Sequence, residues 1–156
     1  MTTEPFTFVR IDASELAAFS DVRQTFWNAM NREEMPRAFR EAARIVADEA
    51  KQEVSKSSTR LPSTIRHGAW NVAFGNKTKG FVKAGGGRGP GLAGLFEYGS
   101  KNSGGRYIRH PLFGNTNYWF NTPTKPFLYP AAISRQEAIA QEIEDGIERA
   151  RRKAGL

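Results

Sequence analysis

Cysteine is absent from this 156-residue chain, and histidine occurs only twice. Without a thiol, the chain can form no disulfide bond, bind no metal through cysteine and use no cysteine nucleophile. No stretch approaches the roughly 18 consecutive apolar residues of a membrane-spanning helix. The first residues, MTTEPFTFVRID, lack the basic and then apolar segments of a secretory leader. We therefore expect a cytoplasmic protein, or one released by lysis, that is stabilised by packing or assembly.

Groups that could support catalysis are also few. The middle of the chain offers only His67, His110 and Glu97, and their spacing matches neither a catalytic arrangement nor a metal site. The glycine-rich segment GGGRGPG, residues 85–91, lacks the Lys-Ser or Lys-Thr pair that completes a phosphate-binding loop. The sequence predicts no enzyme and no cofactor.

Positive charge is concentrated in the middle of the chain. The formal net charge is +7, yet residues 51–110 contain six Lys and five Arg against only Glu53 and Glu97. A basic region of this kind suits nucleic acid or an acidic protein surface, and charge alone does not choose between them.

Apolar spacings predict two helices in the first third. Residues 12–31 carry Leu16, Phe19, Val22, Phe26 and Met30 at helical spacing, in a helix that is either continuous or broken near Ser20. A clearer helix begins near Pro36, since proline suits a first helical turn. Its apolar stripe is Phe39, Ala43, Val46, Ala50 and Val54, and the small polar residues 55–59 end it. Residues 6–11, FTFVRI, predict a short strand or an extended arm.

After residue 60 the spacing of apolar residues shortens from a helical to a strand-like period. Residues 61–84 predict a hairpin with a bulge or turn near Gly68 or Asn71, and a return strand over 80–84 after a turn that contains GNKTKG, residues 75–80. A short helix at 92–96 and strands at 107–110 and 117–121 come next. The last helix runs from about Tyr129 or Ser134 to Lys153, with Ser134 and Glu137 as a capping box. Its apolar stripe is Ile139, Ile143, Ile147 and Ala150.

This order predicts an α+β fold, with long helices packed on one face of a mainly antiparallel β-sheet, a C-terminal helix and long flexible glycine-rich loops. We divide the chain into an N-terminal extension, residues 1–34, and a single α+β domain, residues 35–156.

An aromatic and basic stretch, residues 95–131, is poor in regular structure. Lys101, Arg106, Arg109, Tyr107, Phe113 and Trp119 would suit a surface that binds single-stranded nucleic acid by charge and stacking. The alternative, which the surrounding Pro and Gly favour, is that Trp119, Phe120 and Phe127 belong to a core or a protein interface.

Two motifs in this stretch, LFEYGS at 95–100 and TKPFLYPA at 124–131, precede the charged terminal helix. Together they resemble the neck or tail-component proteins of long-tailed double-stranded-DNA phages. TRLPSTIR at 59–66 and RHPLFGNTNYWFN at 109–121 fit the same pattern, so the resemblance covers about residues 35–153. The glycine-rich insert before Leu92 and the N-terminal extension depart from it.

The resemblance implies a non-enzymatic virion structural protein at the head-tail junction, made in the bacterial host cytoplasm. It would join or complete the tail as part of a homo-oligomeric ring, sixfold or a multiple, beside the connector, tail terminator or tail-tube proteins, without a membrane. The implied motif and interface residues are Glu97, Tyr98, Gly99, Trp119, Pro126, Phe127, Leu128 and Pro130. Residues expected to face channel DNA or an acidic partner are Lys77, Lys79, Lys83, Arg88, Lys101, Arg106 and Arg109.

One residue of the motif carries a specific structural expectation. Glu97 either pairs with a basic residue, accepts backbone hydrogen bonds from the KPFL turn, or is an ordinary exposed carboxylate.

Three other functions remain open at this point. A tail terminator that caps the tail tube is the closest, followed by a small basic nucleic-acid-binding module and a metal-dependent nuclease.

Overall fold

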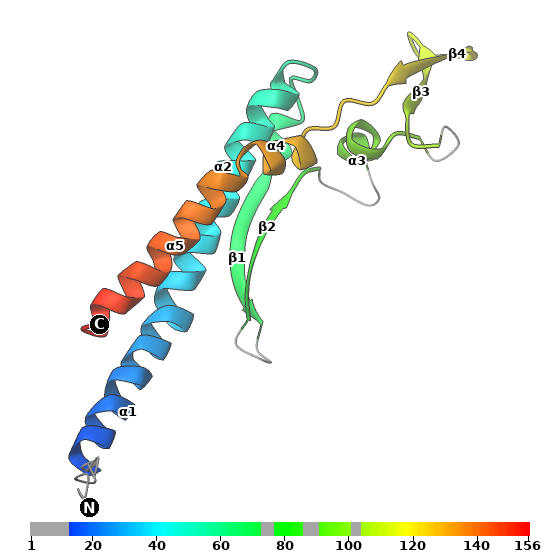
Figure 1. The fold of residues 1–156 in the computed structure, drawn as a ribbon. Coiled ribbons are helices and arrows are strands. Elements are labelled where there is room, and N and C mark those ends of the chain that lie inside the picture. Colours follow the sequence, from blue (N-terminus) through cyan, green and yellow to red (C-terminus); the bar gives the residue numbers. More distant parts are fainter. Residues whose placement is uncertain (1–12, 73–76, 86–90, 101–103) are drawn as a thin grey trace, which may run out of the picture.

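The computed structural model describes residues 13–72, 77–85, 91–100 and 104–156 (Figure 1). The elements in chain order are α1 (Ala13–Asn28), η1 (Ala29–Glu34), α2 (Met35–Ser55), η2 (Pro62–Thr64), β1 (Arg66–Val72), β2 (Lys77–Lys83), α3 (Gly91–Tyr98), β3 (Tyr107–Leu112), β4 (Asn115–Pro123), α4 (Leu128–Ser134) and α5 (Gln136–Lys153). The α+β prediction is confirmed, although the strands form two separate antiparallel pairs. The predicted arm at 6–11 and most of the glycine-rich connector lie outside the described residues.

Residues 13–55 form one uninterrupted helical rod, so the break near Ser20 does not occur. Its middle part, η1, is π-helical, and the Met35 N–H donates to the Met30 carbonyl oxygen five residues earlier. Pro36 follows at the start of α2. Proline has no N–H and its ring collides with the carbonyl four residues back in an α-helix, so a wider turn directly before it relieves both problems. The rod therefore passes through Glu34 and Met35, where we divided the chain.

Small residues let α2 and α5 approach closely. Ala38 and Ala150 are fully buried, and a Cβ atom added to Gly146 would lie 2.8 Å from the Ala38 Cβ. The predicted stripe of α2 is confirmed at Ala43, Val46, Ala50 and Val54, whereas Phe39 is half-buried. Close helix packing of this kind depends on small side chains because any added atom forces the backbones apart.

The β1–β2 hairpin packs against α2. Its pairing is regular from Arg66 opposite Lys83 to Val72 opposite Lys77, so the predicted bulge is wrong and β2 begins before the expected residue 80. Gly80 lies against the helix, and a Cβ there would be 3.0 Å from the Phe39 carbonyl oxygen. An extended return strand thus starts within the segment predicted as a turn.

The main core lies at the end of α2 that the other elements surround. Val46, Ala47, Ala50 and Val54 meet Leu61 and Ile65, which flank η2, and residues from α3 and α4. Phe127 and Val54 are the largest fully buried side chains. The core is narrow because alanine supplies much of it.

The C-terminal helical region is divided at Arg135 into α4 and α5, so both predicted starting points mark part of it. The capping box is wrong, because the Ser134 hydroxyl donates to the Ala131 carbonyl and Arg135 precedes the first turn of α5. In the predicted stripe, Ala150 is buried, whereas Ile147 is exposed.

The β3–β4 hairpin projects from the helical body (Figure 1). The two strands contact each other far more than any other element, and most of their residues are exposed. Across the described part of the chain, no helix combines the length and apolar character needed to cross a membrane.

Candidate functional site

Glu97, at the end of α3, joins the two sequence motifs. Its carboxylate accepts hydrogen bonds from the backbone N–H groups of Phe127 (2.8 Å), Leu128 (3.0 Å) and Tyr129 (2.9 Å), which open α4. The residue is 9% exposed. A carboxylate at the first N–H groups of a helix satisfies donors that lack intrahelical partners and suits the positive end of the helix dipole. The expectation of backbone bonds from the KPFL turn is thus confirmed.

Further backbone bonds link α3 to the base of the β3–β4 hairpin. The Lys125 N–H donates to the Phe96 carbonyl (3.1 Å), and the Ser100 N–H donates to the Tyr107 carbonyl (2.8 Å). These bonds fix the segments that enter and leave the hairpin. Together with the Glu97 bonds they form the motif junction, which ties α3, the hairpin base and the start of α4.

Gly99 ends α3 with φ of +74°. A Cβ atom there would lie 2.9 Å from each of three atoms, in Gly105, Tyr107 and Thr124. Both the left-handed conformation and the lack of space require glycine. The glycine of the first motif is therefore needed for the turn into the hairpin.

The other motif residues divide between interior and surface. Phe127 is 1% exposed and belongs to the core, and Leu128 is half-buried. Tyr98 is 74% exposed, and the two prolines of the second motif, Pro126 and Pro130, are exposed as well. Phe127 therefore presents no surface to a partner, whereas Tyr98 and the prolines do.

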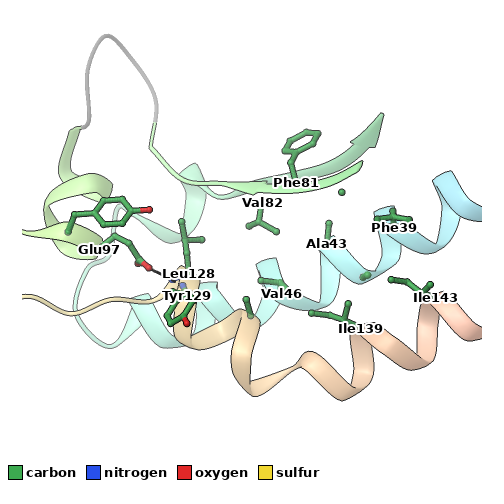
Figure 2. Close-up of a pocket in the computed structure, with 14 residues that line it drawn as sticks. Phe39, Ala43, Val46, Phe81, Val82, Glu97, Leu128, Tyr129, Ile139 and Ile143 are labelled. Carbon is green, nitrogen blue, oxygen red and sulfur yellow. Dashed lines mark hydrogen bonds between the residues drawn. The ribbon is translucent and has the colours of Figure 1, made fainter. Parts of the chain in front are cut away.

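An apolar groove of about 470 Å³ runs between β2 and α5, with α2 as its floor. Figure 2 shows Val82 of β2 pointing towards Val46 of α2 and Ile139 of α5, with Glu97 and Tyr129 at one end. Further apolar lining comes from Phe39, Ala43, Leu128, Ala132 and Ile143. Phe39, Ile139 and Ile143 belong to the apolar stripes predicted from sequence, but they are only half-buried and line this groove.

The predicted basic residues fall on both hairpins. On the face of β1–β2 opposite to α2, Lys79 and Lys83 lie beside Trp70 and Phe81, whose rings are 4.7 Å apart, and Lys83 Nζ lies 5.8 Å from the Phe81 ring centre. Arg66 pairs with Lys83 on this face. We call this set of five residues the outer sheet face. Arg66 and Trp70 were missed because only strand pairing brings them beside the lysines. Lys77 begins β2, and Arg88 and Lys101 lie outside the described residues.

Arg106 and Arg109 belong to the β3–β4 hairpin. The Arg109 guanidinium lies 5.0 Å from the Trp119 ring centre, a cation–π contact on an exposed face. The opposite face carries His110, whose Nε2 is 2.9 Å from the Thr122 hydroxyl. The exposed aromatic residues of this hairpin are Tyr107, Phe113, Tyr118, Trp119 and Phe120.

Charge is segregated along the chain. Between Val54 and Gln136 the only acidic residue is Glu97, and its carboxylate is taken up by the motif junction. The charged side chains of both hairpins are therefore all basic. By contrast, the first part of α5 contains acidic residues and no Lys or Arg: Glu137, Glu142, Glu144, Asp145 and Glu148.

A second carboxylate, that of Glu34, joins the middle of the helical rod to the C-terminal end of α5. Glu34 is 3% exposed and accepts bonds from Arg149 Nε and Lys153 Nζ, each at 2.8 Å. Hydrogen bonds from Lys153 and Arg149 lower the pKa of Glu34 below its ordinary value of 4.5. The bond to Glu34 raises the pKa of Arg149, and bonds to Glu33 and then Glu34 raise the pKa of Lys153. Sequence spacing gave no signal for this cluster because its members are more than a hundred positions apart.

The groups considered for catalysis do not come together. His67 lies on β1 and His110 on β3, while the Glu97 carboxylate binds the backbone of α4. Within the described ranges, no three histidine, aspartate or glutamate residues lie close enough to hold a metal ion.

Comparison with known proteins gives no relative for this chain: no family model, no curated protein and no solved structure matches it.

Proposed function

We propose that this protein is a non-enzymatic structural component of a phage head-tail junction, which joins or completes the tail as part of a ring around the DNA channel. It would be made in the bacterial cytoplasm and incorporated into the virion. The observation that carries the proposal is the motif junction, in which the Glu97 carboxylate binds the backbone N–H groups of Phe127, Leu128 and Tyr129.

This junction supports the proposal because it gives the two motifs one physical task. Glu97, Gly99 and Phe127 hold a projecting aromatic hairpin on the helical body, so they stabilise a presented surface. Large aromatic side chains and arginine are enriched at the energetic centres of protein interfaces. A part whose task is to bind neighbouring subunits needs such a surface.

The outer sheet face suits the DNA side of a channel. Lys79 and Lys83 with Arg66 would attract phosphate groups without reading sequence, and no acidic side chain interrupts them. Attraction of this kind weakens as salt rises, because bound counterions are released on binding. It lets DNA slide past the ring.

Cryo-electron microscopy of virions from the source of this sequence tests the proposal. We expect density for the chain in a ring between head and tail, with the outer sheet face towards the lumen. A ring at the upper end of the tail tube, without contact with the head connector, would identify a tail terminator instead. Absence of the chain from purified particles would contradict both assignments.

A nucleic-acid-binding module is the second candidate, favoured by the stacking of Arg109 on Trp119. Aromatic side chains with neighbouring cations bind single strands by stacking. An electrophoretic mobility assay at physiological salt separates the two functions. Tight binding of single-stranded DNA that Trp119→Ala abolishes would favour the module, whereas weak, salt-sensitive binding that Lys79→Ala reduces would favour the channel component.

A further inference from the structure

We propose that the tip of the β3–β4 hairpin of one copy docks into the apolar groove between β2 and α5 of a second copy, with Phe113 as the anchor. This contact would form the interface between neighbouring subunits of the proposed ring, so the inference rests on the proposed function. The surfaces that argue for it are both present on this chain.

Phe113 is the first observation. It is 99% exposed and its φ is +47°, and it is followed by Gly114 with φ of +80°. Two-residue hairpin turns with positive φ at both positions prefer Asn, Asp or Gly, because other side chains strain the backbone there. A phenylalanine in this place is unfavourable for the free chain in both conformation and solvation. A partner that receives the ring explains why the turn presents it.

The groove is the second observation. Val46, Ile139 and Ile143 leave an apolar channel open to solvent beside β2. The hairpin of the same chain extends away from α2 and α5, beyond α3 (Figure 1). A tip that points away from its own groove can reach only the groove of another copy.

The charges on the hairpin and beside the groove favour one orientation of the docked hairpin. The hairpin carries Arg109 on β3, Arg106 lies directly before β3 at the hairpin base, and no acidic residue occurs between Tyr98 and Gln136. The groove is bordered by α5, whose first part is acidic and includes the exposed Glu144 and Asp145. The strand that carries Arg109 towards the aromatic tip therefore complements the acidic α5 edge of the groove.

The symmetry of this contact follows from its parts. Tip and groove are different surfaces, so each copy can give one tip and receive another. A head-to-tail contact of this kind generates a closed ring when its rotation returns to the start, and an open filament otherwise.

Disulfide trapping tests the contact directly, because the chain has no cysteine of its own. Two full-length single-cysteine proteins are mixed and oxidised: Thr116→Cys beside the tip and Tyr129→Cys in the groove, both at exposed positions. In the control, the Thr116→Cys protein is mixed with a Lys56→Cys protein instead. We expect the cross-link between positions 116 and 129 of two chains to form at a yield at least tenfold above the cross-link between positions 116 and 56. Equal yields with the two partners would overturn the proposal.

Phe113→Asn separates docking from folding. Asparagine tolerates the positive φ of the turn, so thermal unfolding followed by circular dichroism should be unchanged or shifted to higher temperature. Added to the Thr116→Cys protein, this change should lower the cross-link yield at least tenfold. An unchanged yield would overturn the role of Phe113. If deletion of residues 1–12 abolishes the cross-link while Phe113→Asn does not, the N-terminal segment mediates assembly and the proposal fails.

The two proposals can fail separately. A ring between head and tail with no effect of Phe113→Asn on self-association would retain the function and reject this contact. Loss of self-association in Phe113→Asn, for a protein absent from particles, would retain the contact and reject the function.

Discussion

Two phenylalanines of one chain mark the contrast between its two regions. Phe127 is 1% exposed in the core at one end of α2, and Phe113 is 99% exposed at the tip of the β3–β4 hairpin. The body is built largely from alanine and short aliphatic side chains, whereas the hairpin displays most of its aromatic rings to solvent. Apolar composition therefore does not locate a core. Here the large apolar side chains are concentrated on the surface that projects.

The two regions are also held by different forces. Burial and close helix packing stabilise the body, while the hairpin depends on strand pairing and on the motif junction at its base. A two-stranded hairpin alone is marginally stable in water. Its position relative to the body rests on a few hydrogen bonds, and those bonds can be removed one at a time.

The largest expected effect on stability comes from truncating a phenylalanine in the core, compared with one in the hairpin. Phe127→Ala should lower the free energy of unfolding by about 3 to 5 kcal/mol, because it leaves a cavity in a narrow core. The matched change in the hairpin, Phe120→Ala, should cost about 1 kcal/mol or less. Urea denaturation of both variants measures the difference. Similar losses would show that the hairpin is part of the same cooperative core.

Glu97→Ala comes next. It should lower the free energy of unfolding by about 2 to 3 kcal/mol, because three backbone N–H groups lose their acceptor and one of them, on Phe127, is buried. Glu137→Ala, at an exposed position in the first turn of α5, is the control and should change stability by about 0.5 kcal/mol or less. A Glu97 variant as stable as the control would mean that water replaces the carboxylate without loss.

Gly99→Ala should cost about 1 to 3 kcal/mol, since the new methyl group meets backbone atoms in an already unfavourable conformation. Gly114→Ala has a similar positive φ and open space around it, so it isolates the conformational part, about 1 kcal/mol. Thermal unfolding of both variants gives the steric part by difference. If the two variants lose equal stability, the crowding at Gly99 has no energetic consequence.

The smallest expected effect is on the pH dependence of stability, through Glu34 of the helical body. Because the pKa of Glu34 is lowered in the folded protein, its ion pairs stabilise the fold above its ordinary pKa of 4.5, and this contribution is lost as pH falls through the lowered value. Glu34→Gln should therefore weaken the loss of stability on acidification. Urea titrations at about pH 6 and pH 3 measure it, with the exposed-site change Glu144→Gln as the control. Identical pH slopes for Glu34→Gln and Glu144→Gln would contradict the assignment.

Local patterns predicted the elements well. Apolar spacing located the α2 stripe and the short helix α3, and the alternating pattern with its turn predicted the β1–β2 hairpin. The aromatic runs predicted the strands β3 and β4, but not that they pair. The acceptor role of Glu97 was one of three alternatives that the sequence left open, and the structure selects it by placing the carboxylate at the unpaired N–H groups that open α4. Signals within a few residues were sufficient for the helices and strands, whereas the Glu97 bonds join residues about thirty positions apart.

Features set by distant contacts could not be predicted. The exposure of Trp119 and Phe120 depends on how far the hairpin stands from the body, and the pairing of Glu34 with Arg149 depends on how α5 crosses the rod. The bulge expected near Gly68 is absent because the Phe81 ring lies across that glycine, where a Cβ would be 2.8 Å away. The ring from the partner strand covers the glycine without any change of register.

The π-helical segment before Pro36 sets the phase of the whole rod. An α-helix turns about 100° per residue, so one additional residue in a turn rotates everything N-terminal to it by that angle. The side of α1 that bears Trp27 therefore faces a different direction from the one that α2 alone would dictate. Deleting a single residue between Ala29 and Glu34 would rotate α1 about its axis by about 100° and leave α2 and its contacts in place.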